Sequence, residues 1–153
     1  MLSKSLLLCA LLAGVSYVPG CFACKCAQPD FCDVLSDDAN IVLRGTTLSR
    51  EVGDTEYDDV TYVVEVAELF NGSPSLDKPY PQTLTFLTVG DTAACGVYLE
   101  LDEDYLVHVY FDDDEGVYRS KNCGLTRKWS RLTNKQKRTL RTGYGCDDDD
   151  DSY

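Results

Sequence analysis

The tripeptide Cys24-Lys25-Cys26 could carry metal chemistry because it follows a candidate signal-peptidase site. Cleavage after Ala23 would make Cys24 the first residue of the mature chain. Its free α-amino nitrogen and its carbonyl oxygen would then lie side by side, and a disulfide would hold the residue in place. Such a pair of atoms is a rigid N,O chelator. Its expected partner is a metal ion with an open coordination position in another protein.

Residues 1–23 have the pattern of a secretory signal peptide. The apolar run Leu6–Val15 is too short to span a bilayer. Small residues, Cys21 and Ala23, occupy positions −3 and −1 before the expected cleavage point. The alternatives are a buried core helix, cleavage after Gly20, and a lipoprotein site at Cys21. A signal peptide predicts secretion into the extracellular space or matrix.

The cysteine count favours cleavage after Ala23. The chain contains eight cysteines, at positions 9, 21, 24, 26, 32, 95, 123 and 146. Cleavage after Ala23 leaves six, an even set suited to an oxidising compartment, whereas cleavage after Gly20 leaves seven. Neighbouring cysteines rarely meet disulfide geometry, so the first three should pair with distant partners. Sequence alone does not choose among the connectivities. We expect one mature domain over 24–146 with three disulfides.

Charge is unevenly distributed along the chain. Removing the signal peptide changes the formal charge from −12 to −13, which argues against nucleic acid as a partner. Nine basic residues and no acidic ones lie between Arg119 and Arg141. They fit either a solvated helix face or a site for sulfated polysaccharide. The run Asp147–Asp151 predicts a disordered acidic tail over 147–153. No segment after the signal peptide is long enough for a membrane span.

Most of the mature chain has β-forming patterns separated by turns rich in Gly, Asn and Asp. Five short strands are expected, at Asn40–Thr47, Val60–Phe70, Leu84–Val89, Val97–Leu101 and Tyr105–Phe111. Five such strands predict a mainly β fold, a small closed or partly open barrel. Two flanking helices are also expected. One lies near Phe31–Asp38, and the other starts at Thr133 with Gln136 at the capping-box position and ends before Gly143.

The residues give little support for an enzyme. The one histidine, His108, lies in the middle of an expected strand, where alternation places it on one face with Leu106 and Tyr110. We expect it to be a barrel or surface side chain. With the cysteines oxidised, it has no thiolate partner and no second histidine, so we expect no catalytic residue and no cofactor. The sequon Asn71-Gly72-Ser73 makes Asn71 a candidate N-glycosylation site.

Several motifs occur together in one known family. The chain has C-x-C at the mature N-terminus, Phe31-Cys32, the strand VTYVVEVAELFNG and the segment AACGVYLELDEDYLV. These are followed by a cysteine, then W-x-x-L, and a closing G-x-G-C. The combination resembles a tissue inhibitor of metalloproteinases (TIMP) over nearly all of residues 24–146. The resemblance is to a single netrin-like N-terminal inhibitory domain, and it implies an OB-fold barrel.

The resemblance implies a disulfide pairing and a mechanism. In the family's order, the pairs are Cys24–Cys95, Cys26–Cys123 and Cys32–Cys146. In the family, the amino nitrogen and carbonyl oxygen of the first residue chelate the target's catalytic zinc, and here that residue is Cys24. The chelate would displace the zinc-bound water, which is the nucleophile. The resemblance thus implies a secreted inhibitor of extracellular zinc metalloproteinases, whose only metal is the zinc of its target.

The resemblance also implies which residues touch the protease. Lys25 would enter the specificity pocket beside the zinc, where family members commonly have Ser or Thr. The residues after it would continue the contact with the protease, so that residues 24–28 form an N-terminal wedge. The link to Cys95 would add a second contact segment. The implied contacts are Cys24, Lys25, Cys26, Ala27, Gln28, Ala93 and Ala94. The alternative function is a netrin-like extracellular module that binds matrix or polysaccharide without inhibiting.

Overall fold

The computed structural model describes residue 27 and residues 29–55, 58–72, 82–90, 95–121 and 123–146. Strands dominate this part of the chain, and short helices flank them. In chain order the elements are α2 (Phe31–Ser36), β1 (Asn40–Val52), β2 (Asp59–Asn71), β3 (Gln82–Val89), β4 (Asp104–Asp112), β5 (Val117–Arg119), β6 (Arg127–Lys128), the 3-10 helix η3 (Trp129–Arg131) and α3 (Asn134–Thr142).

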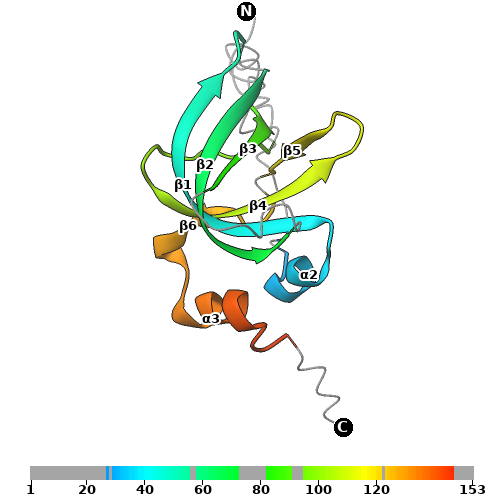
Figure 1. Cartoon of the computed structure of the whole chain (residues 1–153), viewed down its shortest axis with the longest axis vertical. Coiled ribbons are helices and arrows are strands. Elements are labelled where there is room, and N and C mark those ends of the chain that lie inside the picture. Colours follow the sequence, from blue (N-terminus) through cyan, green and yellow to red (C-terminus); the bar gives the residue numbers. More distant parts are fainter. Residues whose placement is uncertain are drawn as a thin grey trace, which may run out of the picture.

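The strands form a closed five-stranded barrel. The sheet order is β1-β2-β3-β5-β4-β6, and an additional pairing of β1 with β4 closes the ring. The pairing of β3 with β5 is parallel, and the other pairings are antiparallel. Both α2 and α3 lie at one end of the barrel, below β1 and β4 in Figure 1. The expected mainly β, five-stranded fold is therefore confirmed.

Two apolar cores explain why β1 and β4 lack a clean alternation of apolar and polar residues. The barrel interior contains Ile41 and Leu43 of β1, whereas Val42 between them belongs to a second core with α2 and α3. In β4, Val107 faces the interior and Leu106 faces the second core. Successive residues of a strand point to opposite faces, so a strand buried on both faces is apolar throughout.

One expected strand is wrong. The segment Val97–Leu101 forms no strand, and the fifth strand of the barrel is the short β5 instead. Val97 and Leu99 are nevertheless buried in the barrel core, while Tyr98 between them is exposed. The alternation that suggested a strand is therefore real, but it reflects burial of every second side chain without a neighbouring strand.

Side-chain hydroxyl groups replace a strand partner for this segment. Three of its backbone N–H groups donate to hydroxyl oxygens of the barrel strands, so they are satisfied without a ladder. The bonds run from Val97 N to Thr88 Oγ1 (3.0 Å), from Leu99 N to Tyr62 Oη (3.1 Å) and from Glu100 N to Tyr105 Oη (3.1 Å).

Helix α3 begins and ends where the sequence predicts. Gln136 N donates to Thr133 Oγ1 (3.2 Å), and Thr133 N donates to Gln136 Oε1 (2.8 Å), which is the reciprocal pattern of a capping box. Gly143 ends the helix with a left-handed φ of 64°. No helix in the described part of the chain is both long and apolar enough to cross a membrane.

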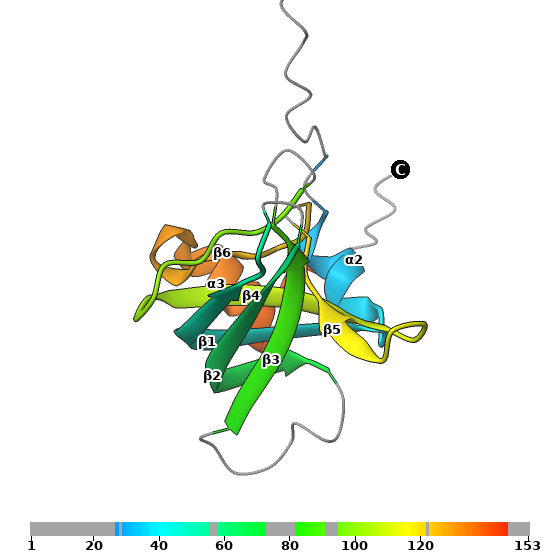
Figure 2. The ribbon, with the colours of Figure 1, turned by 90° about the horizontal axis from the view of Figure 1, so that it is seen from above.

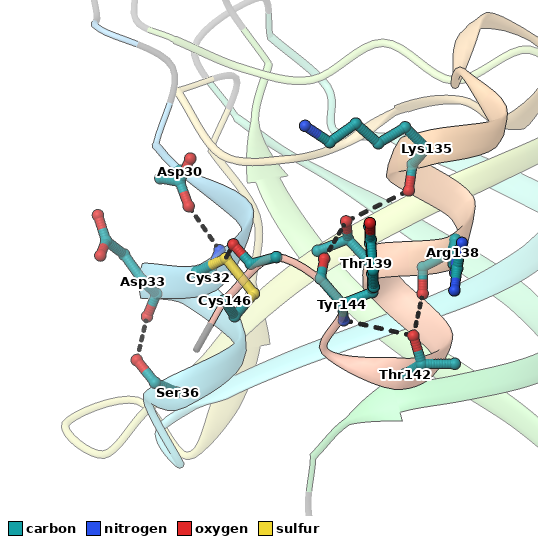
Figure 3. Close-up of a disulfide and its surroundings, with 11 residues drawn as sticks. Asp30, Cys32, Asp33, Ser36, Lys135, Arg138, Thr139, Thr142, Tyr144 and Cys146 are labelled. Carbon is teal, nitrogen blue, oxygen red and sulfur yellow. Dashed lines mark hydrogen bonds between the residues drawn. A yellow bond between two sulfur atoms is a disulfide. The ribbon is translucent and has the colours of Figure 1, made fainter. Parts of the chain in front are cut away.

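A disulfide fastens α2 to the segment that follows α3. Cys32 and Cys146 are joined with an S–S distance of 2.08 Å, and this is the pair that the family resemblance implies. Figure 3 shows the bond beside Thr139 of α3, whose hydroxyl donates to Tyr144 O (2.9 Å). The two helices are therefore held together covalently at the end of the second core.

Candidate functional site

Two loop segments bond to the same part of β3, near its end. In the 95–101 segment, Val97 donates its backbone N–H to Thr88 Oγ1 (3.0 Å). In the 120–126 segment, Ser120 donates its backbone N–H to Leu87 O (2.9 Å). Because Leu87 and Thr88 are consecutive residues, the two segments begin side by side.

Each of these segments carries a disulfide-bonded cysteine, Cys95 in the first and Cys123 in the second. Cys95 has a φ of 71°, a left-handed conformation that non-glycine residues rarely adopt. The residues that follow enter the network of hydroxyl bonds that holds residues 97–100. Any chain that is bonded to Cys95 is thus tied to a rigid part of the barrel.

The chain that leads into α2 reaches the barrel beside Cys123. A pocket of about 390 Å³ is lined by Pro29 together with His108, Tyr110, Lys121, Cys123 and Gly124. Pro29 is close in sequence to the expected N-terminal wedge, and Ala27, two residues earlier, is exposed. The blue segment before α2 can be followed at this edge of the barrel in Figure 2. The barrel therefore receives the N-terminal chain at the same end as the two bonded loops.

Most of the expected site residues cannot be placed. Six of the seven implied protease contacts lie outside the described residues, and so do the two cysteines expected to pair with Cys95 and Cys123. Those pairings and contacts stay predictions. The six contacts are Cys24, Lys25, Cys26, Gln28, Ala93 and Ala94.

His108 is half-buried and both of its ring nitrogens are engaged. Leu125 N donates to Nδ1 (3.2 Å), and Nε2 lies 3.0 Å from Asn40 Oδ1. Burial lowers the pKa of His108 below its ordinary value of 6.5, and the negative charge of Asp37 opposes that shift. Strand alternation did not reveal these contacts, which reach from β4 to β1 and to the 120–126 segment.

Asn71 ends β2 with its side-chain nitrogen directed at backbone carbonyls. Nδ2 donates to Asp37 O (3.0 Å), Asn40 O (3.1 Å) and Val34 O (3.4 Å). A glycan would be attached to this same nitrogen and would disturb these bonds. Glycosylation at Asn71 stays a prediction, and it would carry a structural cost.

Six of the nine basic residues in the 119–141 region fall into two groups. Arg119, Lys128 and Arg141 are each ion-paired with carboxylates. Arg119 lies 2.8 Å from Asp59 and also pairs with Glu115, and these hydrogen bonds raise the pKa of its guanidinium. The second group is exposed on η3 and α3 with no ion pair among the described residues. It consists of Arg131, Lys135 and Arg138.

Sequence reasoning missed the residues that make the site rigid. Tyr62 and Tyr105 look like ordinary strand residues, and nothing local indicates that their hydroxyls accept bonds from the 95–101 segment. Among the described residues, no group of three or more His, Cys, Asp or Glu could hold a metal ion.

A family model described as tissue inhibitor of metalloproteinase matches residues 22–148. The match covers the expected N-terminal cysteines, both bonded loops and the disulfide at Cys146. The chain belongs to this family, whose members are inhibitors rather than enzymes.

A curated relative agrees with this assignment. Metalloproteinase inhibitor 3 of Xenopus laevis is 28% identical over 133 residues, which cover 80% of this chain and 56% of the relative. The chain thus spans little more than half the length of the curated relative that it matches.

Proposed function

We propose that this chain is a secreted inhibitor of extracellular zinc metalloproteinases. Its mature N-terminus, Cys24, would chelate the catalytic zinc of the target through its α-amino nitrogen and carbonyl oxygen. Lys25 would point into the neighbouring specificity pocket. Cys26, Ala27, Ala93 and Ala94 would line the rest of the contact.

One observation carries this proposal beyond family membership. The two loops with bonded cysteines, Cys95 and Cys123, start side by side on β3, and Pro29 brings the N-terminal chain to the same end. If Cys24 and Cys26 are the partners, two disulfides fix the chelating residue to a rigid support. A preorganised ligand loses little entropy on binding, so such an arrangement favours tight inhibition.

The chemistry of the chelate is consistent with neutral pH. A free α-amino group has a reference pKa of about 7.7–8.0, so the zinc ion replaces a proton at modest cost. Catalytic zinc sites keep an open position for water. Occupation of that position by the amine removes the nucleophile, and the carbonyl oxygen completes a bidentate ligand.

The proposal is tested on the protein secreted from its own full-length reading frame. Mass spectrometry of the product is expected to give Cys24 as the first residue, with no free thiol. Titration against catalytic domains of several zinc metalloproteinases is expected to show stoichiometric inhibition of at least one, and none of a serine protease used as a control. A correctly processed, folded protein that inhibits no member of a broad zinc protease panel would contradict the proposal.

The exposed cations Arg131, Lys135 and Arg138 favour a second candidate function, binding of sulfated polysaccharide. They have no carboxylate partner among the described residues, so their charge is available to a polyanion. Replacing all three by Ala should lower the salt concentration needed to elute the protein from immobilised heparin. Lys128→Ala is the control, because Glu100 already pairs with Lys128 at 2.8 Å. Elution of the wild-type protein without retention would exclude this function.

A further inference from the structure

A directed chain of hydrogen bonds runs from α2 to the 120–126 segment through His108. Asn40 Nδ2 donates to Asp37 Oδ2 (3.1 Å) and to Val34 O (3.4 Å), which fixes the orientation of the Asn40 amide. Its other atom, Oδ1, therefore faces His108 Nε2 at 3.0 Å. Leu125 N then donates to His108 Nδ1 (3.2 Å).

These bonds specify one protonation state of the imidazole. A backbone N–H can only donate, so Nδ1 must present its lone pair to Leu125. The neutral ring then carries its hydrogen on Nε2, which donates to Asn40 Oδ1. A second proton would have to be placed on Nδ1, directly opposite the N–H of Leu125.

His108 also attaches the 120–126 segment to β4 through its backbone. Its backbone N–H donates to Thr126 Oγ1 (2.9 Å), and its carbonyl accepts from Ser120 Oγ (2.8 Å). Gly124 packs so closely on the ring that an added Cβ would lie 2.7 Å from Nδ1. His108 thus supports both sides of Cys123, through its backbone carbonyl at Ser120 and through its ring at Gly124 and Leu125.

We propose that His108 is a positioning residue of the inhibitor, whose neutral imidazole holds Cys123 and, through its disulfide, the zinc-binding N-terminus. This inference rests on the proposed function and on the pairing of Cys123 with Cys26. Protonation of Nδ1 replaces a hydrogen bond by two opposed N–H groups. The 120–126 segment must then shift, and the N-terminal wedge loses part of its preorganisation.

Proton uptake by the His108 ring is expected below pH 6.5, because burial lowers the pKa of the ring. The ring lines the 390 Å³ pocket with Tyr110 and Lys121, so water can reach it. The charged groups around it are Asp37, whose carboxylate favours the protonated ring, and Lys121, whose ammonium group lies 5.1 Å from the Tyr110 ring centroid. Burial outweighs Asp37 and keeps the pKa below 6.5, so the ring is neutral at neutral pH.

The first arm of the test compares inhibition constants of the wild-type protein and His108→Asn from about pH 7.5 to about pH 5.5. The asparagine Oδ1 can accept from Leu125 as Nδ1 does, but it does not titrate. Protonation of the Cys24 amine and of the protease affects both forms equally, so the ratio of the two constants isolates His108. We expect wild-type inhibition to weaken about three- to tenfold relative to the variant, the size of one hydrogen bond. A ratio that does not change with pH would overturn the role of His108.

The second arm needs no variant. Nitrogen NMR of the wild-type protein should show hydrogen on Nε2 of His108 at neutral pH, and the amides of Leu125 and Cys123 should shift with the same midpoint as the ring. Amides that remain constant through the ring titration would overturn the proposal even if His108→Asn fails to fold. Absence of inhibition at every pH would contradict the proposed function itself. A constant ratio of the two inhibition constants in an active inhibitor would contradict only the role of His108.

Discussion

At the scale of single residues, Lys25 should determine selectivity more than basal affinity. A lysine ammonium in a closed apolar pocket loses its hydration, whereas in an open or acid-lined pocket it keeps water or gains a partner. Lys25→Thr should therefore strengthen inhibition of proteases with deep apolar pockets and leave it equal or weaker for those with polar pockets. The expected difference is about 1–3 kcal/mol, measured as inhibition constants across a panel of zinc proteases.

The pattern of changes in the inhibition constants across the panel is more informative than their magnitude. Specificity is a difference between affinities, so a residue that reads the pocket must change the ranking of the proteases. A uniform shift across the panel, or no shift, would mean that Lys25 does not enter the pocket. Thermal unfolding of both forms serves as the control for an intact fold.

Gly124 is a second residue at which a small change, the addition of one methyl group, should change the stability. The alanine Cβ would lie 2.7 Å from His108 Nδ1 and 3.2 Å from Lys121 O, closer than carbon atoms normally approach. Gly124→Ala should lower the free energy of unfolding by about 1–3 kcal/mol, as other overpacked sites do. Denaturant titration measures this, with Lys121→Ala as a surface control. Wild-type stability in Gly124→Ala would show that the ring and the loop are not in tight contact.

At the scale of elements, three hydroxyl groups hold the 95–101 segment in place of a neighbouring strand. Tyr62→Phe removes the acceptor of the buried Leu99 N–H while keeping the ring. The unsatisfied N–H should cost about 1–3 kcal/mol in denaturant titrations. Tyr98→Phe is the matched control, because Tyr98 is 60% exposed and should change little. Equal effects of the two substitutions would argue that the hydroxyl bonds do not support the segment.

The same segment shows where sequence patterns stop predicting elements. Helix α3 is predictable because its capping box and its final glycine are local signals. The 95–101 segment resembles a strand because Val97 and Leu99 are buried, but its backbone N–H groups bond to hydroxyl groups, and the partner of Leu99, Tyr62, lies 37 residues away. β5 has only three residues, and Arg119 at its end pairs with the nearby Glu115 and also with Asp59 on β2. No local window contains that information.

At the scale of the whole molecule, the disulfides should have separable roles. Cys32–Cys146 joins residues 114 positions apart and fastens α2 to the end of α3. Its replacement by two alanines should cost about 2–5 kcal/mol of stability but leave saturating inhibition unchanged. Cys95→Ser should cost a similar amount and also weaken inhibition, because it is expected to release Cys24.

Unfolding free energies and inhibition constants of the two variants, measured below their unfolding temperatures, distinguish these roles. Peptide mapping provides the direct check on connectivity. A bond from Cys24 to Cys26 or Cys32 would contradict the account, since the chelating residue would then have no covalent link to the 95–101 segment.

The barrel could be predicted from sequence, whereas the chelating residue stays a prediction. Apolar runs and turn residues are enough to indicate five strands, although they misplace one. The chelator is expected from a cleavage site and a cysteine pattern, both of which are contiguous in the chain. The side-by-side docking of Ser120 and Val97 on β3 could not be predicted, because it depends on how the closed barrel brings distant loops together.

The central claim is that a free α-amino group on Cys24 binds the target's zinc, and one added residue tests it most directly. An alanine placed before Cys24 converts that amine into an amide, which is a poor zinc ligand, while the barrel and its disulfides are unaffected. The measurement is the inhibition constant of the extended protein beside that of the protein beginning at Cys24, with thermal unfolding showing that both are folded. The account predicts that the extended protein loses inhibition almost completely. Inhibition at full strength by the extended, folded protein would contradict it.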